Sequence, residues 1–225
     1  MKIVVLTGAG ISAESGLKTF RDSNGLWEGH DVMEVASPEG FAANPELVLD
    51  FYNQRRRQLL AVEPNMAHNA LANLEVTHEV TIITQNVDDL HERAGSTTIL
   101  HLHGELLKVR STEPPFAVQS WKEDVVIGDL CENGHQLRPD IVWFGEAVPM
   151  MDVAVDEIEN AEAVMIVGTS MQVYPAAGLM QYAPNDVPIY FVDPKPSLSS
   201  TSRITVFAEK ATTGVLKAIA NINDL

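Results

Sequence analysis

The chain has 225 residues and a formal net charge of −16 at pH 7, and 45% of its residues are hydrophobic while 20% are charged. These proportions are typical of a globular protein with a sizeable core. Because a general polynucleotide-binding protein needs a basic surface, the acidic balance excludes nucleic acid as the expected partner. The first apolar run, Ile3 to Leu6, is too short for a signal-peptide core or a membrane span, and no longer run follows, so we expect a cytoplasmic protein without membrane contact.

Short apolar runs along the chain predict buried β-strands. They cover residues 3–7, 80–84, 98–102, 141–144, 163–168, 189–193 and 204–208. Helical patterns occupy residues 45–60, 67–74 and 151–160, and the first of these helices has Asn44 as N-cap and Pro45 at its first position. Because strands alternate with helices, we expect an α/β protein with a Rossmann-type parallel sheet that is covered on both faces.

Two segments interrupt the alternation of strands and helices. One covers about residues 31–65 and ends in a helix, and the other covers about residues 105–138 and is rich in polar and turn residues. We expect these insertions to form a smaller domain beside a large domain of about residues 1–30, 66–104 and 139–225.

A glycine-containing loop follows the first predicted strand directly. Its sequence, from Gly8 through Ala9, Gly10 and Ser12 to Ala13, matches the G-x-G-x-x-G/A pattern of dinucleotide-binding folds. In that pattern the glycines permit a tight turn and a close approach to phosphate, the small last residue allows close packing, and the next helix offers N–H donors. The alternative is a tight turn without a ligand. Residues 23–30 look like a loop rather than a second strand, which argues against an ordinary dehydrogenase.

Five sequence blocks carry more specific information than the glycines alone. The first is residues 8–16 with Thr19, Phe20 and Arg21, and the others are residues 84–95, 103–104, 138–146 and 168–176. In content and order they resemble the signature of the sirtuin (Sir2) family, over roughly residues 3–196. The variant Ala-Glu-Ser at residues 13–15 and the block at residues 51–55 resemble the bacterial deacylase branch, class III. The resemblance implies a cleft between a Rossmann-type large domain and a small domain.

The resemblance also implies a reaction that consumes NAD as a co-substrate. The amide oxygen of an acyl-lysine attacks the ribose carbon as nicotinamide leaves, a base activates a ribose hydroxyl, and the products are lysine, nicotinamide and O-acyl-ADP-ribose. The catalytic residues carried over are His103, as the general base, and Asn86. His101 lies two residues earlier and ranks well below His103, while His30, His68, His78 and His135 have no comparable context.

The NAD-binding residues are carried over from the same blocks. They are Gly8, Ala9, Gly10, Ser12, Ala13, Phe20, Arg21, Trp27, Gln85, Asn86, Asp88, Gly168, Thr169, Ser170, Asp193 and Ala211. Asn86 and Asp88 are expected to hold the ribose and the nicotinamide amide, although either side chain could instead cap a helix. Phe20 is expected to shield the ribose carbon, with core packing as the alternative. Asp193 replaces the usual asparagine at the adenosine ribose.

Two features point to the acyl-peptide substrate. Tyr52 and Arg55 share a face of the predicted helix, and in the class III branch such a pair recognises the carboxylate of succinyl- or malonyl-lysine. The alternative is that Arg55 belongs to a solvated basic run, residues 55–57. We also expect the protein to remove acetyl groups. The small side chain of Ala13 is expected to leave room in the acyl pocket. The peptide is expected to lie extended against two segments that contribute Val142, Phe144, Gly145, Val173 and Tyr174.

The chain departs from the family at the zinc module. Sirtuins usually hold structural zinc with four cysteines, but here Ser111, Pro114 and Gly134 occupy three of those places and Cys131, the only cysteine, occupies the fourth. A single cysteine excludes an intrachain disulfide and fits a reducing compartment. Cys131 and His135 offer two ligands at most, so we expect no zinc, and packing by Phe116, Trp121 and Leu130 in its place.

Two other functions remain open from the sequence. One is mono-ADP-ribosyl transfer from NAD, and the other is a module that senses NAD or ADP-ribose without turnover. The presence of His103, Asn86 and Asp88 argues against the second.

Overall fold

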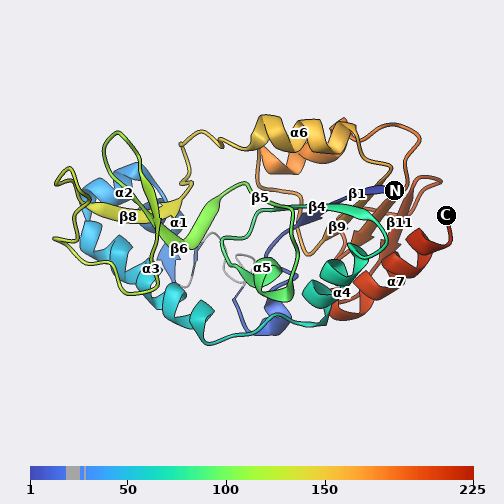
Figure 1. Ribbon diagram of the computed structural model, residues 1–225, viewed down its shortest axis with the longest axis horizontal. Helices are drawn as coiled ribbons and strands as arrows, with labels where there is room; N and C mark the ends of the chain where they lie inside the picture. Colours follow the sequence, from blue (N-terminus) through green and yellow to red (C-terminus); the bar gives the residue numbers. More distant parts are fainter. Residues whose placement is uncertain (19–25, 28) are drawn as a thin grey trace.

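A six-stranded parallel sheet forms the larger part of the protein (Figure 1). The computed structural model describes residues 1–18, 26, 27 and 29–225. The strand order is β11-β10-β9-β1-β4-β5, and every neighbouring pair is parallel. The strands are β1 (Lys2–Thr7), β4 (Glu79–Thr84), β5 (Ile99–His101), β9 (Ala163–Val167), β10 (Ile189–Val192) and β11 (Ile204–Phe207).

Helices cover both faces of this sheet, as the alternating pattern predicts. Figure 1 shows α6 (Met151–Glu159) on one face and α4 (Met66–Leu74) with α7 (Ala211–Asn223) on the other. Side chains of β1 alternate between the two cores: Ile3 and Val5 pack with α4 and α7, whereas Val4 and Leu6 pack with α6 and the 3₁₀ helix η3 (Ala176–Tyr182). A strand that is buried on both faces is therefore apolar along its whole length.

The two inserted segments come together at one end of the sheet (Figure 1). A short hairpin precedes the first segment, which contains three helices. The second segment contains most of a three-stranded antiparallel sheet in the order β7-β6-β8. These elements are β2 (Leu26–Trp27), β3 (His30–Asp31), α1 (Val32–Val35), α2 (Pro38–Ala43), α3 (Pro45–Leu60), β6 (Gly104–Ser111), β7 (Val118–Ser120) and β8 (Leu137–Ile141). The start of α3 is as predicted, because Asn44 Oδ1 accepts a hydrogen bond from Leu47 N at 3.1 Å.

Two predicted elements are wrong. The apolar run 141–144 is not a strand of the large sheet: β8 ends at Ile141, and the next amides donate to separate segments, Val142 N to His103 O and Phe144 N to Ala36 O, both at 2.9 Å. The glycine loop is followed by the three-residue 3₁₀ helix η1 (Ala13–Ser15) rather than by an α-helix. Gly16, in the left-handed region at φ 101°, ends this turn.

Three glycines let the ends of β1 and β9 touch. Gly10 N donates to Gly168 O at 2.8 Å, and Gly8 N donates to Val167 O at 3.0 Å. A Cβ on Gly10 would lie 2.6 Å from Gly168 Cα, and one on Gly168 would lie 2.4 Å from Ile11 N. Backbone therefore contacts backbone here, and no side chain fits between the two loops.

We predict that Gly10→Ala destabilises the protein by about 1–3 kcal/mol, because the new methyl group overlaps backbone that has no room to move. Urea unfolding followed by circular dichroism measures this loss. The matched control is Gly178→Ala, whose Cβ would meet only Tyr174 Cε1 at 3.9 Å. Equal midpoints for the two variants would contradict the contact.

Candidate functional site

A cavity of about 320 Å³ lies beside the carboxyl ends of β1, β4 and β9 and extends toward α3 and the 141–146 segment. The chain runs from β1 to β4 and β5 on one side and later returns to add β9, β10 and β11 on the other side of β1. Such a switch point is where open α/β sheets bind ligands. The predicted site residues that line the cavity are Gly8, Ala9, Gly10, Ser12, Trp27, Tyr52, Arg55, Gln85, Asn86, Asp88, His103, Val142, Phe144, Gly145, Gly168, Thr169, Ser170, Val173 and Tyr174. Most of the predicted residues are thus gathered in one place.

The structure places three other predicted NAD residues away from this lining. Ala13 is exposed in η1, Asp193 is buried after β10 and accepts a hydrogen bond from Lys195 N at 2.8 Å, and Ala211 begins α7. Because Ala13 is outside the cavity lining, its small size does not create room there. Phe20 and Arg21 lie outside the described residues.

Hydrogen bonds join the loop after β1 to the loop after β4. Asn86 Nδ2 donates to Gly8 O at 3.2 Å and to Ser12 Oγ at 3.1 Å, while Ser12 Oγ donates to Asp88 Oδ2 at 2.9 Å. Asp88 Oδ1 also accepts from Leu90 N at 3.2 Å, a bond of the kind that starts a helix. The helix-start alternative is thus present in the structure, and both Asp88 oxygens accept hydrogen bonds from the protein.

Burial raises the pKa of Asp88 from 3.8 to about 6, although the hydrogen bonds from Ser12 and Leu90 act in the opposite direction. Among the described residues, the carboxylate has lost water and no ion pair with a cation is recorded for it. Asp88 lines the cavity, so its carboxylate can accept a further hydrogen bond from an amide of a bound ligand.

His103 has the tautomer that a general base needs. Its Nδ1 lies 3.0 Å from Gln85 O, and because a carbonyl can only accept, the hydrogen must be on Nδ1. The lone pair is then on Nε2. Burial lowers the pKa of His103, so the ring stays neutral at neutral pH. This imidazole can take a proton from a group that is bound in the cavity.

His101 has a different environment and a different charge. Its Nε2 lies 2.6 Å from Glu92 Oε1 and its Nδ1 lies 3.4 Å from Asn86 O, so both nitrogens face acceptors and the ring is an imidazolium. Burial disfavours that charge, but the hydrogen bond and charge of Glu92 outweigh burial and raise the pKa of His101. The strand ends at His101, which turns its ring to the Asn86 carbonyl outside the cavity lining.

Sequence reasoning missed two buried histidines behind the site. Asn65 N donates to His68 Nδ1 at 3.2 Å, and His68 Nε2 lies 3.4 Å from Ser12 Oγ. His91 Nε2 lies 3.1 Å from Thr7 Oγ1, and the two imidazole rings are 4.9 Å apart. Burial lowers the pKa of His68 to about 4. The sequence signal was a capping box at Asn65, which predicts a helix start but not a contact to Ser12.

The far end of the cavity is formed by α3 and the 141–146 segment. Tyr52 is fully buried in its wall and accepts a hydrogen bond from Trp143 Nε1 at 3.0 Å. Burial raises the pKa of Tyr52, so its hydroxyl remains protonated. The Arg55 guanidinium lies over the Phe51 ring, 3.2 Å from its centre, and Arg55 Nη1 donates to Phe51 O at 2.5 Å. This end of the cavity combines a cation with a phenol.

The degenerate zinc module is held together differently from the prediction. Phe116 and Leu130 are more than half exposed, so they do not form a core, and Trp121 is only partly buried. The buried residues there are Leu49, Val109, Val125 and Leu137, which pack around β6 and β8. Cys131 Sγ lies 3.5 Å from Ser111 Oγ. The expectation that this module binds no zinc stays a prediction.

The one group of three potential metal ligands within the described residues lies elsewhere, at Glu92, His101 and Glu105. Two of its members already form the His101–Glu92 ion pair, and Glu105 pairs with Lys108 Nζ at 2.5 Å. These contacts explain the group as ion pairs.

The fold and the cavity together define an α/β protein with a nucleotide-type site at the switch point of its sheet. The chain matches the Sir2 family over residues 8–175. It is 64% identical over 193 residues to an NAD-dependent protein deacylase of Helicobacter pylori, covering 86% of this chain and 84% of that one. Identity is 54% over 220 residues to an NAD-dependent protein deacylase of Bacteroides thetaiotaomicron, covering 95% and 94%.

Solved structures agree with the sequence match. A Sir2 homologue in complex with NAD superimposes with a TM-score of 0.87 at 38% identity, covering 99% of this chain and 90% of that chain. A Sir2 mutant with a deacetylated p53 peptide and 3′-O-acetyl-ADP-ribose gives a TM-score of 0.81 at 29% identity, covering 97% and 92%. This chain belongs to the Sir2 family. No helix among the described residues is long and apolar enough to cross a membrane.

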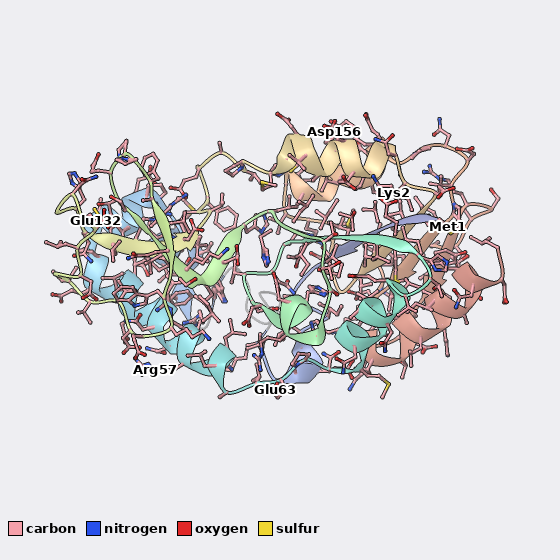
Figure 2. All side chains as sticks on the ribbon, viewed as in Figure 1. Met1, Lys2, Arg57, Glu63, Glu132 and Asp156 are labelled. Atoms are coloured by element: carbon pink, nitrogen blue, oxygen red, sulfur yellow. The ribbon has the colours of Figure 1, made fainter. Side chains whose placement is uncertain are left out.

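We predict that Asp88→Asn changes the free energy of unfolding more favourably at pH 8 than at pH 5, by about 1–3 kcal/mol, because the amide carries no buried charge. The folded-state pKa of about 6 exceeds the model-compound value of 3.8, so the charged form costs stability above pH 6 and the cost disappears as the pH falls toward 3.8. Chemical unfolding at pH 8 and pH 5 should therefore show a larger gain at pH 8. Asp156→Asn is the control, because Asp156 is exposed on α6 (Figure 2). A pH-independent difference would contradict the assignment.

Proposed function

We propose that this chain is an NAD-dependent protein-lysine deacylase that removes acetyl, succinyl and malonyl groups. NAD is consumed, and the products are nicotinamide, O-acyl-ADP-ribose and the free lysine. The observation that carries the proposal is a neutral imidazole, His103, with Nε2 unprotonated in the same cavity as the glycine loop, Asn86 and Asp88. Curated relatives from Helicobacter and Bacteroides carry the name NAD-dependent protein deacylase.

NAD is expected to bind along the carboxyl edge of the sheet. The contact of Gly10 with Gly168 leaves a floor of backbone without side chains, which suits a pyrophosphate. The hydroxyls of Thr169 and Ser170 and the amides of Gln85 and Asn86 also line the cavity, and Gln85 Nε2 donates to Thr169 Oγ1 at 3.2 Å. Ala13, Asp193 and Ala211, which lie outside this lining, are also assigned to NAD by family resemblance, as are Phe20 and Arg21, which lie outside the described residues.

The reaction needs alignment more than a strong nucleophile. The acyl amide oxygen attacks the ribose carbon while the bond to nicotinamide breaks, and the cavity must hold both groups in line. Asp88 and Asn86 hold the nicotinamide amide and the ribose, so that nicotinamide departs from a fixed place. His103 Nε2 then takes the proton of a ribose hydroxyl, whose oxygen attacks the carbon of the imidate that the first step forms. Water then adds to that carbon, the lysine nitrogen leaves as the free amine, and the acyl group remains on the ribose oxygen as O-acyl-ADP-ribose.

Dicarboxylic acyl groups are expected to reach Tyr52 and Arg55. A guanidinium and a phenol hydroxyl can together bind one carboxylate. Arg55 lies at the cavity wall with its charge over the Phe51 ring and 5.5 Å from the Trp27 ring centre, which favours a fixed guanidinium over a solvated one. Tyr52 supplies a hydroxyl that stays protonated.

The peptide is expected to lie extended between residues 142–146 and 173–176, which supply the predicted contacts of Val142, Phe144, Gly145, Val173 and Tyr174. Phe144 and Tyr174 are 41% and 71% exposed at the rim of the cavity, so an extended chain can cover them.

The proposal includes the division into a large domain (about residues 1–30, 66–104 and 139–225) and a small domain (about 31–65 and 105–138). The separation of the three-stranded antiparallel sheet from the six-stranded parallel sheet supports that division.

Incubation with NAD and either acetyl-lysine or succinyl-lysine peptide tests the function. Mass spectrometry measures both products. We expect release of nicotinamide that depends on the peptide, together with loss of the acyl mass from the peptide. His103→Ala should lower turnover on the order of 100-fold or more, whereas His78→Ala, on the turn after α4, should not. ADP-ribose on a protein would indicate a transferase. Binding of NAD without turnover would indicate a sensor. Either of these two results would contradict the proposed deacylase function.

Arg55→Met is expected to lower the ratio of succinyl to acetyl kcat/KM on the order of 10-fold or more, because it removes a charged hydrogen bond to the carboxylate alone. Arg57→Met is the matched control, since Arg57 is on the same helix but is exposed and pairs with Asp124 (Figure 2). Equal losses on both acyl groups would remove the assigned role of Arg55.

A further inference from the structure

Within the described part of the chain, Trp143 donates the one hydrogen bond recorded for the Tyr52 side chain. Trp143 Nε1 lies 3.0 Å from the Tyr52 oxygen, and both side chains are almost completely buried, at 3% and 0% exposure. The two residues come from segments 91 positions apart, so the bond joins the 141–146 segment to α3 across the wall of the cavity.

A rigid support holds the indole in this orientation. Trp143 N donates to Glu146 Oε2 at 2.8 Å, and the guanidinium of Arg138 stacks on the indole with its carbon 3.3 Å from the ring centre. Arg138 also binds both oxygens of Glu146, at 2.8 and 3.0 Å, and Arg110 binds the same carboxylate at 3.1 Å. Side-chain rotation of Trp143 would break the stacking contact, so the direction of its N–H is fixed.

This bond determines what the Tyr52 hydroxyl can do. A phenol has one O–H donor and accepts through its oxygen, and an indole N–H is only a donor. Trp143 therefore occupies the accepting side of the oxygen and leaves the hydrogen of Tyr52 as a donor. Among the described residues, no acceptor for that hydrogen is recorded, although the side chain is fully buried. A buried donor of this kind is costly until an acceptor arrives.

We propose that Trp143 determines acyl specificity as a positioning residue: its indole N–H holds the Tyr52 oxygen and commits the hydroxyl hydrogen to a carboxylate on the acyl group. The inference rests on the proposed deacylase function and assigns to it a residue that acts through Tyr52. Burial keeps Tyr52 protonated, which a donor requires. A carboxylate that binds Arg55 at the same wall supplies the missing acceptor, whereas an acetyl group ends in a methyl and supplies none.

Trp143→Phe tests the proposal, because phenylalanine keeps an aromatic ring under Arg138 and removes the N–H. We expect KM for succinyl-lysine peptide to rise on the order of 10-fold, and the ratio of succinyl to acetyl kcat/KM to fall by the same factor. A purely structural role for Trp143 would lower kcat/KM for both peptides together, and equal losses would overturn the proposal. Thermal unfolding of each variant shows whether it is folded.

A double-mutant cycle with Tyr52→Phe separates action through Tyr52 from other effects. If Trp143 acts through the phenol oxygen, Trp143→Phe has no further effect on the acyl ratio in the Tyr52→Phe background. Independent, multiplying effects would overturn the proposal. Tyr52→Phe lacks only a hydroxyl and provides the second measurement if Trp143→Phe does not fold: an unaltered acyl ratio in Tyr52→Phe also overturns the inference.

The outcomes distinguish this inference from the function on which it rests. Suppose that Arg55→Met lowers the ratio of succinyl to acetyl kcat/KM but Trp143→Phe leaves this ratio unaltered. The proposed function would then be retained, and the role of Trp143 would be removed. Absence of succinyl turnover by the unaltered chain would overturn both.

Discussion

Direct contact between the backbones of Gly10 and Gly168 sets the geometry on which the rest of the site depends. It closes the gap between the ends of β1 and β9 and leaves no space for a Cβ. The loop after β1 is thereby fixed, and Ser12 reaches the loop after β4, where it binds Asp88 and Asn86. Three strand ends are joined by backbone and small polar groups, so the floor of the cavity consists of peptide units that a large side chain would obstruct.

Electrostatic differences between neighbouring residues follow from this geometry. His103 and His101 are two positions apart and bind consecutive carbonyls, of Gln85 and Asn86, yet one ring is neutral and the other charged. The surroundings of the other ring nitrogen explain this difference in charge. Nε2 of His101 contacts Glu92, whereas Nε2 of His103 faces the cavity. Burial and one neighbouring carboxylate are therefore enough to separate the pKa values of two histidines in one small region.

The acyl end of the cavity depends on a second set of buried contacts. Glu146, Arg138 and Trp143 form one unit, with a bidentate ion pair and a stacked guanidinium, and this unit lies against Tyr52. A charged group is tolerated there because each charge has a close partner. The same segment, residues 141–146, forms the cavity rim, so support for the acyl pocket and the expected path of the peptide are built from one stretch of chain.

The sequence by itself determined the parallel sheet, the start of α3 and most members of the site. Short apolar runs, helix caps and the five ordered blocks depend only on neighbours along the chain. The tertiary structure decided what local patterns do not contain. The run 141–144 is apolar like a strand, yet its amides bind His103 and Ala36. Likewise His68 and His91 lie behind Ser12 only because α4 and α5 (Leu90–Ala94) pack beside β1 and β4. Hydrogen-bond partners and desolvation are set by segments distant in sequence, so protonation states and the Trp143–Tyr52 contact could be known only from the folded chain.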